Sequence, residues 1–295
     1  MSTERIVATD TATSLTRPEA EAKGIALLPL HIIWPDLTQD TDFTMPPEKL
    51  YKEMRVKGIP STSGATYEDF LRFYKGLHEK GAREIVSIHV TDIKSITVAS
   101  AKTASKDLRK TLPDMSIKVI DSKGISLPQL DLVEKAVDFL NRGATLEETE
   151  KGVLEYIPYQ RLYVSVSTLD NLKKGGRVTG AQAFIASAFQ IFPVIELKDG
   201  DVSVKEKVHG QKAGRRRIVE MVEKDAEKMG KPVKLGVIYT ENKEIGEELK
   251  GRLQEIWKED EVTLVGPADA GPILGVHAGP GAGAVAAFWN PPGRS

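Results

Sequence analysis

The stretch EIVSIHVTDIKSITVASAKTASKDLRKTLPDMSIKVIDS, residues 84–122, decides the fold. Its first seven residues, 84–90, form a short apolar run that is typical of a buried strand, and residues 117–122 form a second one. Between them, residues 95–112 have the spacing of apolar side chains that is typical of a helix. Alternation of strand and helix predicts a mostly parallel sheet that is covered by helices on both faces.

The same alternation extends outward from this stretch. We expect further strands at residues 5–10 and 25–33 and further helices at residues 68–81 and 128–143. Ligands of such sheets bind at the carboxyl ends of the strands, and three of these ends read TDTATS, VTDIKS and DSKGIS. Each end is rich in hydroxyl groups and carries one aspartate.

A second unit is expected after residue 160. Thr145 and Glu148 have the spacing of a capping box, which predicts a helix that leads out of the first unit. Strands RLYVSVS, PVIELKDGDVSVKEKV, VKLGVIYT and EVTLVGP follow, with a hairpin turn at Asp199-Gly200 and helices at 212–229 and 243–257. The predicted fold is a two-domain α/β protein, with a parallel-sheet N-terminal domain at residues 1–160 and an α+β C-terminal domain at residues 161–290.

Composition excludes several classes of partner. The 295 residues contain 41 basic and 42 acidic side chains, so no basic field would attract nucleic acid or an anionic membrane. No apolar run has the 18 or more residues of a membrane span, and stable membrane insertion is not expected. The chain has no cysteine, and the start MSTERIVATD lacks the apolar part of a signal peptide, which together favour a cytoplasmic location.

Four residues in distant parts of the chain are candidates for binding an anion. Residues 61–63, which include Thr62, carry hydroxyls just before one expected helix. Ser95 and residue 97 carry hydroxyls at the start of a second expected helix. At such positions a hydroxyl either caps the helix or faces an anion. Arg177 follows two glycines in LKKGGRV, and both a solvated arginine and an anion-binding one are open. His277 is the only titratable side chain in the glycine-rich stretch GVHAGPGAGAV, residues 275–285.

Metal, cofactor and hydrolase chemistry receive little support. The aspartates that end strands, at positions 10, 92 and 121, lack the spacing of metal ligands, and no metal is expected. The glycines at 279–283 fit neither a dinucleotide fingerprint nor a Walker A loop, and no cofactor is expected. An acyl hydrolase that uses Ser95, His277 and an aspartate stays open, although no G-x-S-x-G motif is present.

Eight segments in order resemble the DegV family over nearly the whole chain. They are RIVATDTATSL, LLPLHI, PSTSGATYEDF, VTDIKSITVASA, VIDS, LDNLKKGGRV with PVIELKDG, KVHGQKA and GPILGVHAGPGAGAV. This family is known for bacterial fatty-acid-binding proteins, including the binding subunits of a fatty acid kinase. The resemblance implies a non-catalytic protein with a long-chain fatty acid between two α/β domains, its tail in the N-terminal domain and its carboxylate near the interface.

The resemblance also implies roles for single residues. Thr62, Ser95 and His277 would hold the carboxylate, and Arg177 would lie near the same end of the pocket. The family's arginine in the KVR stretch, which contacts the acyl kinase, is His209 here, and Ile96 stands in place of a usual glycine. The resemblance implies presentation of the carboxylate to an acyl kinase, and His209 counts against that contact. The alternatives are a lipid-binding regulatory protein without a kinase partner and an acyl hydrolase that uses the same cleft.

Overall fold

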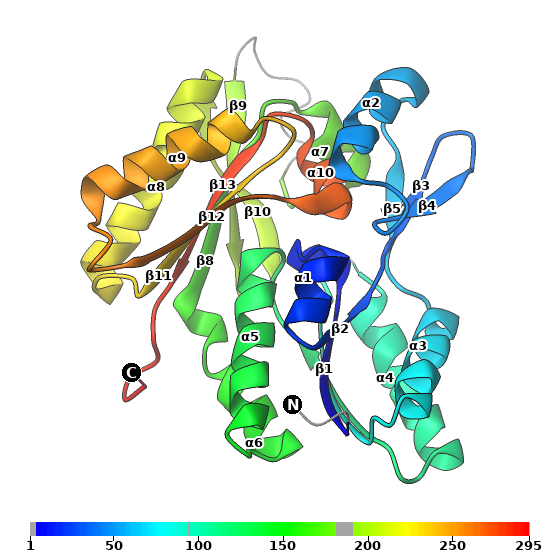
Figure 1. Ribbon diagram of the computed structural model, residues 1–295. Coiled ribbons are helices and arrows are strands. Elements are labelled where there is room, and N and C mark those ends of the chain that lie inside the picture. The colour runs from blue at the N-terminus through cyan, green and yellow to red at the C-terminus, as the bar shows by residue number, and fades with distance from the viewer. Residues whose placement is uncertain (1–3, 94, 181–190, 295) are drawn as a thin grey trace.

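The structure is a computed structural model that describes residues 4–93, 95–180 and 191–294. A four-stranded, fully parallel sheet with the order β2-β1-β6-β7 forms its first half (Figure 1). Its strands are β1 (Arg5–Asp10), β2 (Ile25–Leu28), β6 (Glu84–His89) and β7 (Ser116–Asp121). The parallel sheet predicted from residues 84–122 is confirmed.

Helices cover both faces of this sheet. On one face, α3 (Tyr67–Glu79) and α4 (Thr97–Thr111) pack on Ala8 and Ile85; on the other, α5 (Leu127–Asn141) and α6 (Leu146–Leu154) pack on Val7 and Val86. Successive side chains of a strand point to opposite faces, and so neighbouring residues of β1 and β6 belong to different apolar clusters. Shorter elements complete this half: η1 (Thr11–Thr13), α1 (Arg17–Ala22) and α2 (Pro47–Lys57).

A small antiparallel sheet lies beside the first one. It has the order β4-β3-β5, with strands β3 (His31–Ile33), β4 (Gln39–Thr41) and β5 (Ser61–Ser63). The prediction of one strand over residues 25–33 is wrong, because the chain leaves the parallel sheet after Leu28 and enters the small sheet at His31. Pro29 lies at the break and has no N–H to donate to a ladder.

A six-stranded mixed sheet forms the second half. Its order is β10-β9-β8-β13-β11-β12, and of its pairs only β11–β12 is parallel in the part of the chain that the structure describes. The strands are β8 (Gln160–Ser165), β9 (Ile191–Lys198), β10 (Asp201–His209), β11 (Lys234–Tyr239), β12 (Thr263–Asp269) and β13 (Gly283–Phe288). Helices α8 (Gln211–Met229) and α9 (Lys243–Ile256) pack on one face (Figure 1).

The second half connects back to the first through two short helices. After η2 (Ile157–Tyr159) and β8, α7 (Asp170–Gly175) precedes β9, and α10 (Gly271–Ala278) lies between β12 and β13. Ile273 and Val276 of α10 belong to the apolar cluster of the first half, together with Leu50 and Tyr51 of α2. The first strand of the six-stranded sheet begins at Gln160, and the division into domains at that residue stays a prediction.

The described part of the chain contains no helix with the length and apolar content that a bilayer span requires.

Candidate functional site

A cavity of about 280 Å³ lies where the two halves of the molecule meet. Part of its wall comes from loops at the carboxyl ends of the parallel strands, the edge at which ligands of such sheets bind. Most of its apolar lining comes from residues after 160, including Leu162, Val164, Ile195, Val202, Ile238 and Ala284 of the six-stranded sheet. The cavity is therefore a mainly apolar pocket with few polar groups, which is the usual composition of a site for a small organic ligand.

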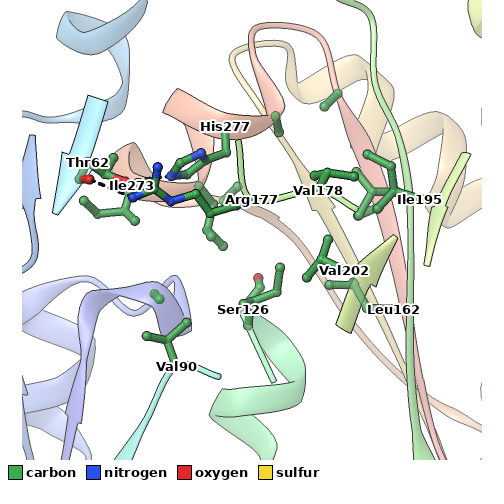
Figure 2. Close-up of a pocket in the computed structure, with 18 of the residues that line it drawn as sticks. Thr62, Val90, Ser126, Leu162, Arg177, Val178, Ile195, Val202, Ile273 and His277 are labelled. Atoms are coloured by element: carbon green, nitrogen blue, oxygen red, sulfur yellow. Dashed lines mark hydrogen bonds between the residues drawn. The ribbon is translucent and has the colours of Figure 1, made fainter. Parts of the chain in front are cut away.

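Thr62 and His277 form the polar centre of this cavity. Thr62 lies in β5, where it pairs with Ile32, and His277 lies in the last turn of α10. The Oγ1 atom of Thr62 is 2.7 Å from Nε2 of His277, although the two residues are 215 positions apart in the sequence (Figure 2). The structure thus brings these two candidates into direct contact.

The surroundings of His277 decide which of its nitrogens carries the proton. Burial, and then the charge of Arg177, lower the pKa of His277 to about 4, so the ring is neutral at pH 7. Its Nδ1 atom is buried with no hydrogen-bond partner among the described residues, and it lies against Gly175, where a Cβ would come within 2.5 Å. A proton on Nδ1 would be a buried donor without an acceptor. We infer that Nε2 carries the proton and donates it to Thr62, which leaves the Thr62 hydroxyl proton free for a ligand.

Arg177 lies beside this pair and lines the same cavity. Gly176, the residue after α7, has a left-handed backbone with φ of 62°, which turns the chain and delivers Arg177 to the cavity. The guanidinium donates to the carbonyl oxygen of Gly175 at 2.7 Å and to that of Thr62 at 3.4 Å. A cation held by two carbonyls next to an apolar cavity favours an anionic head group at this end.

Ser95 also lines the cavity, but its hydroxyl makes its own local bonds. Its Oγ donates to Oγ1 of Thr97 at 3.0 Å and accepts from the backbone N–H of Thr97 at 3.3 Å, at the start of α4. Gly64, two residues after Thr62, packs closely there, because a Cβ at this glycine would lie 3.2 Å from the Ser95 oxygen. The structure thus joins Thr62, His277 and Arg177 directly and places Ser95 across Gly64 from Thr62.

Of the two alternatives for the hydroxyls at residues 61–63, helix capping does not apply. These residues form β5, and the helix α3 is capped by Thr66, whose Oγ1 accepts from the N–H of Asp69 while the Asp69 carboxylate accepts from the N–H of Thr66. Since Thr66 takes the cap, the Thr62 hydroxyl is left to point at His277.

Helix α10, which carries His277, is held by side chains that sequence reasoning missed. Asp42 Oδ1 accepts from the N–H of Ile273 at 3.1 Å, and Asn171 Nδ2 donates to the carbonyl of Val276 at 2.8 Å. Burial raises the pKa of Asp42 to about 7, with the nearby charge of Asp10 acting in the same direction. No local signal marks Asp42, because its partner lies 231 residues further along the chain.

The hydrolase alternative lacks its geometry. The Nδ1 atom of His277 has no carboxylate partner among the described residues, and Ser95 is bonded to Thr97. A Ser-His-Asp series does occur elsewhere: Ser87 Oγ lies 2.7 Å from Nε2 of His89, whose Nδ1 lies 3.0 Å from Asp10 Oδ2. Ser87, His89 and Asp10 are fully buried, so no substrate reaches this serine.

The strand-end aspartates have different partners. Asp10 binds His89, whereas Asp92 and Asp121 both pair with Lys123. In the parts of the chain that the structure describes, no group of three or more His, Asp or Glu residues could hold a metal ion.

The fold and cavity define an α/β protein with an interior pocket between two sheets, and comparisons with known proteins identify the family. The family model described as an uncharacterised protein, DegV family, matches residues 5–290, so the chain belongs to the DegV family. A DegV domain-containing protein of Caldanaerobacter subterraneus subsp. tengcongensis is 29% identical over 279 residues, which cover 95% of this chain and 96% of the relative.

Solved structures of the family have the same fold. A DegV family protein from Thermus thermophilus, described for its fatty acid binding, superimposes with a TM-score of 0.84 at 25% identity, over 97% of this chain and 100% of the other. A DegV lipid binding protein from Thermotoga maritima gives a TM-score of 0.83 at 26% identity, over 97% and 98% of the two chains. The predicted family and the α/β fold class are confirmed.

Proposed function

We propose that this protein binds a long-chain fatty acid in the cavity between its two halves, without chemical conversion of the ligand. The observation that carries the proposal is the apolar cavity with the Thr62–His277 pair and Arg177 at one end. The fatty acid and lipid binding described for the Thermus thermophilus and Thermotoga maritima proteins supports the same ligand class.

The head group would lie at Thr62. An ionised carboxylate loses its water when it is buried, and this cost is offset only where hydrogen bonds replace the water. The free proton of Thr62 supplies one such bond, the Arg177 guanidinium supplies positive charge, and Ser95 supplies a further hydroxyl once it releases Thr97. His277 then acts on the carboxylate through Thr62, as the residue that orients its hydroxyl.

The tail would run along the six-stranded sheet. The apolar side chains around the cavity come mainly from residues after 160, so we propose that the tail lies between both halves and not within residues 1–160 alone. At about 0.8 kcal/mol for each buried CH₂, a chain of fourteen methylenes contributes roughly 11 kcal/mol before the costs of association. This term is larger than any one hydrogen bond to the head group, for which about 1.5–3 kcal/mol is typical when one partner is charged.

Binding is tested on the purified protein by native mass spectrometry and by calorimetry with palmitate. We expect a retained fatty acid in the spectrum, and a Thr62→Val variant with about tenfold weaker palmitate binding, since one charged hydrogen bond is lost. Thr103→Val, on the exposed side of α4, is the matched control and should bind as the unaltered protein does. A lipid-free spectrum together with no heat of palmitate binding contradicts the proposal.

We further propose that the bound carboxylate is presented to a partner acyl kinase. Arg177 is exposed while it contacts the head-group end, so a second protein has access to that end. The test is formation of acyl phosphate from the loaded protein, ATP and an acyl kinase, with captured kinase as a second readout.

A regulatory lipid-binding protein without a kinase is the second candidate, and His209 favours it. This exposed residue at the end of β10 stands where the family's kinase-contacting arginine is expected. If the kinase captures a His209→Arg variant but not the unaltered protein, the regulatory function is supported. Acyl phosphate formed with the unaltered protein supports presentation instead.

A further inference from the structure

Ser126 is a second polar feature of the cavity, on a wall that is mainly apolar. It lies at the end of the hydroxyl-rich segment DSKGIS and lines the cavity with 2% of its surface exposed. Figure 2 draws Ser126 apart from the Thr62–His277 pair, on the side where Leu162 and Val202 lie. Its chain neighbours Ile125 and Leu127 pack in the same apolar cluster as Leu162.

The hydroxyl of Ser126 does not perform the usual task of a serine at this position. Ser126 is the residue before α5, where a serine oxygen normally accepts from an N–H group of the first helical turn, but it makes no such bond. Its backbone angles, φ 54° and ψ −133°, are strained for a residue with a side chain. Backbone strain of this kind is characteristic of functional sites, and helix capping does not account for it here.

The hydroxyl proton of Ser126 is donated to the Oγ atom of Ser14. Ser14 Oγ donates its single proton to the carbonyl of Ala270 at 2.9 Å, and it lies 2.8 Å from the Oγ of Ser126. Because Ser14 has no second proton, Ser126 must be the donor between the two hydroxyls. The lone pairs of the Ser126 oxygen then stay available on the cavity wall.

Two threonines on the wall, Thr91 and Thr240, have less acceptor capacity left. Thr91 donates to the carbonyl of Gly200 and accepts from the N–H of Ile93. Thr240 donates to the carbonyl of Gly279 and accepts from the N–H of Ala282. All three hydroxyls have given their protons away, and Ser126 differs from the two threonines because no N–H donor among the described residues occupies either of its two lone pairs.

We propose that Ser126 binds a hydroxyl group carried along the acyl chain, so that the cavity accepts hydroxy fatty acids in addition to unsubstituted ones. The inference rests on the proposed fatty-acid function and adds a second point of recognition, away from the carboxylate. A ligand hydroxyl donates a hydrogen bond to the Ser126 oxygen, whereas an oxo group brings only another acceptor. The site therefore selects a hydroxyl over a ketone at the same chain position.

The test is calorimetric binding of stearate and of positional series of hydroxystearates and oxostearates. Loss of a partner leaves the ligand hydroxyl buried and unpaired, so Ser126→Ala should lower the affinity of the best hydroxystearate relative to stearate by about tenfold. Ser126→Gly removes the same hydroxyl and also relieves the backbone strain, and the same loss in both variants separates recognition from strain. Ser14→Ala frees the Ser126 proton, and it should raise the affinity of the matching oxostearate relative to the hydroxystearate.

Each outcome bears on the inference. A hydroxystearate-to-stearate ratio that is the same in the unaltered protein, Ser126→Ala and Ser126→Gly overturns it, while stearate binding itself leaves the proposed function intact. Failure of stearate to bind the unaltered protein overturns both. A ratio that falls in both Ser126 variants, with stearate affinity unchanged, supports recognition of the hydroxyl.

Discussion

The free energy of unfolding should depend on pH through Asp42, and the substitution Asp42→Asn should remove that dependence. Its carboxylate accepts from Ile273 at the start of α10, and burial raises its pKa from 3.8 to about 7. Between these two values the folded state holds a proton that the unfolded state has released, so the stabilising contribution is complete below pH 3.8 and is lost as the pH rises through 7. Over the two pH units from 5 to 7, at about 1.4 kcal/mol each, the loss is roughly 2 to 3 kcal/mol.

Urea unfolding of the unaltered protein and of Asp42→Asn at pH 5 and pH 8 measures this contribution. Asparagine keeps an oxygen for the N–H of Ile273 but does not titrate, so its stability relative to the unaltered protein should rise by roughly 2 to 3 kcal/mol between the two pH values. His277 has a lowered pKa and makes both proteins more stable as the pH rises from 4 to 6.5, an effect that cancels in the difference. Asp138→Asn, an exposed position on α5, is the control. An Asp42→Asn difference that is equal at pH 5 and pH 8 would refute the assigned cause.

Three further substitutions test the cavity. Gly175→Ala places a Cβ 2.5 Å from Nδ1 of His277 and should displace the ring from Thr62, with several-fold weaker palmitate binding in calorimetry; Gly76→Ala, where a Cβ meets nothing within 4 Å, should bind normally. His277→Ala should weaken binding by about tenfold or less, because the tail contributes most of the burial energy, and complete loss of lipid in native mass spectrometry would contradict that weighting. Ala284→Phe fills the sheet side of the cavity and should shift the retained acids toward shorter chains in the same spectra, whereas an unchanged chain-length profile would place the tail elsewhere.

The elements that were predicted correctly are those in which the local sequence pattern agrees with the tertiary contacts of the same residues. The Asp199-Gly200 turn predicted a hairpin, and β9 and β10 are antiparallel on either side of it, with φ of 50° and 88° at the two turn residues. The capping box of Thr145 and Glu148 is present with both of its bonds. The prediction of a single strand over residues 25–33 failed because the apolar run continues through Pro29. The two strands within this run form hydrogen bonds in different sheets.

The candidate site was predictable in composition but not in geometry. Hydroxyls next to an expected helix suggested caps, and only the structure shows that Thr66 takes the cap and that Thr62 faces His277. Contacts between residues 215 positions apart depend on how α10 packs against the first half, and no spacing within the sequence encodes that packing. Ser126 was visible only as one hydroxyl in DSKGIS, because its significance comes from the direction of a proton on Ser14.

The position of the cavity links ligand binding to the contact between the two halves. The tail would cover apolar side chains of the six-stranded sheet, and the head group would meet Thr62 of the first half, whose hydroxyl is oriented by His277 of the second half. Because a ligand that binds only the folded state stabilises it, occupancy should stabilise the folded arrangement of both halves together. The tail supplies most of that stabilisation without regard to direction, whereas the hydroxyl of Thr62, oriented by His277, determines which end of the acid lies beside Arg177.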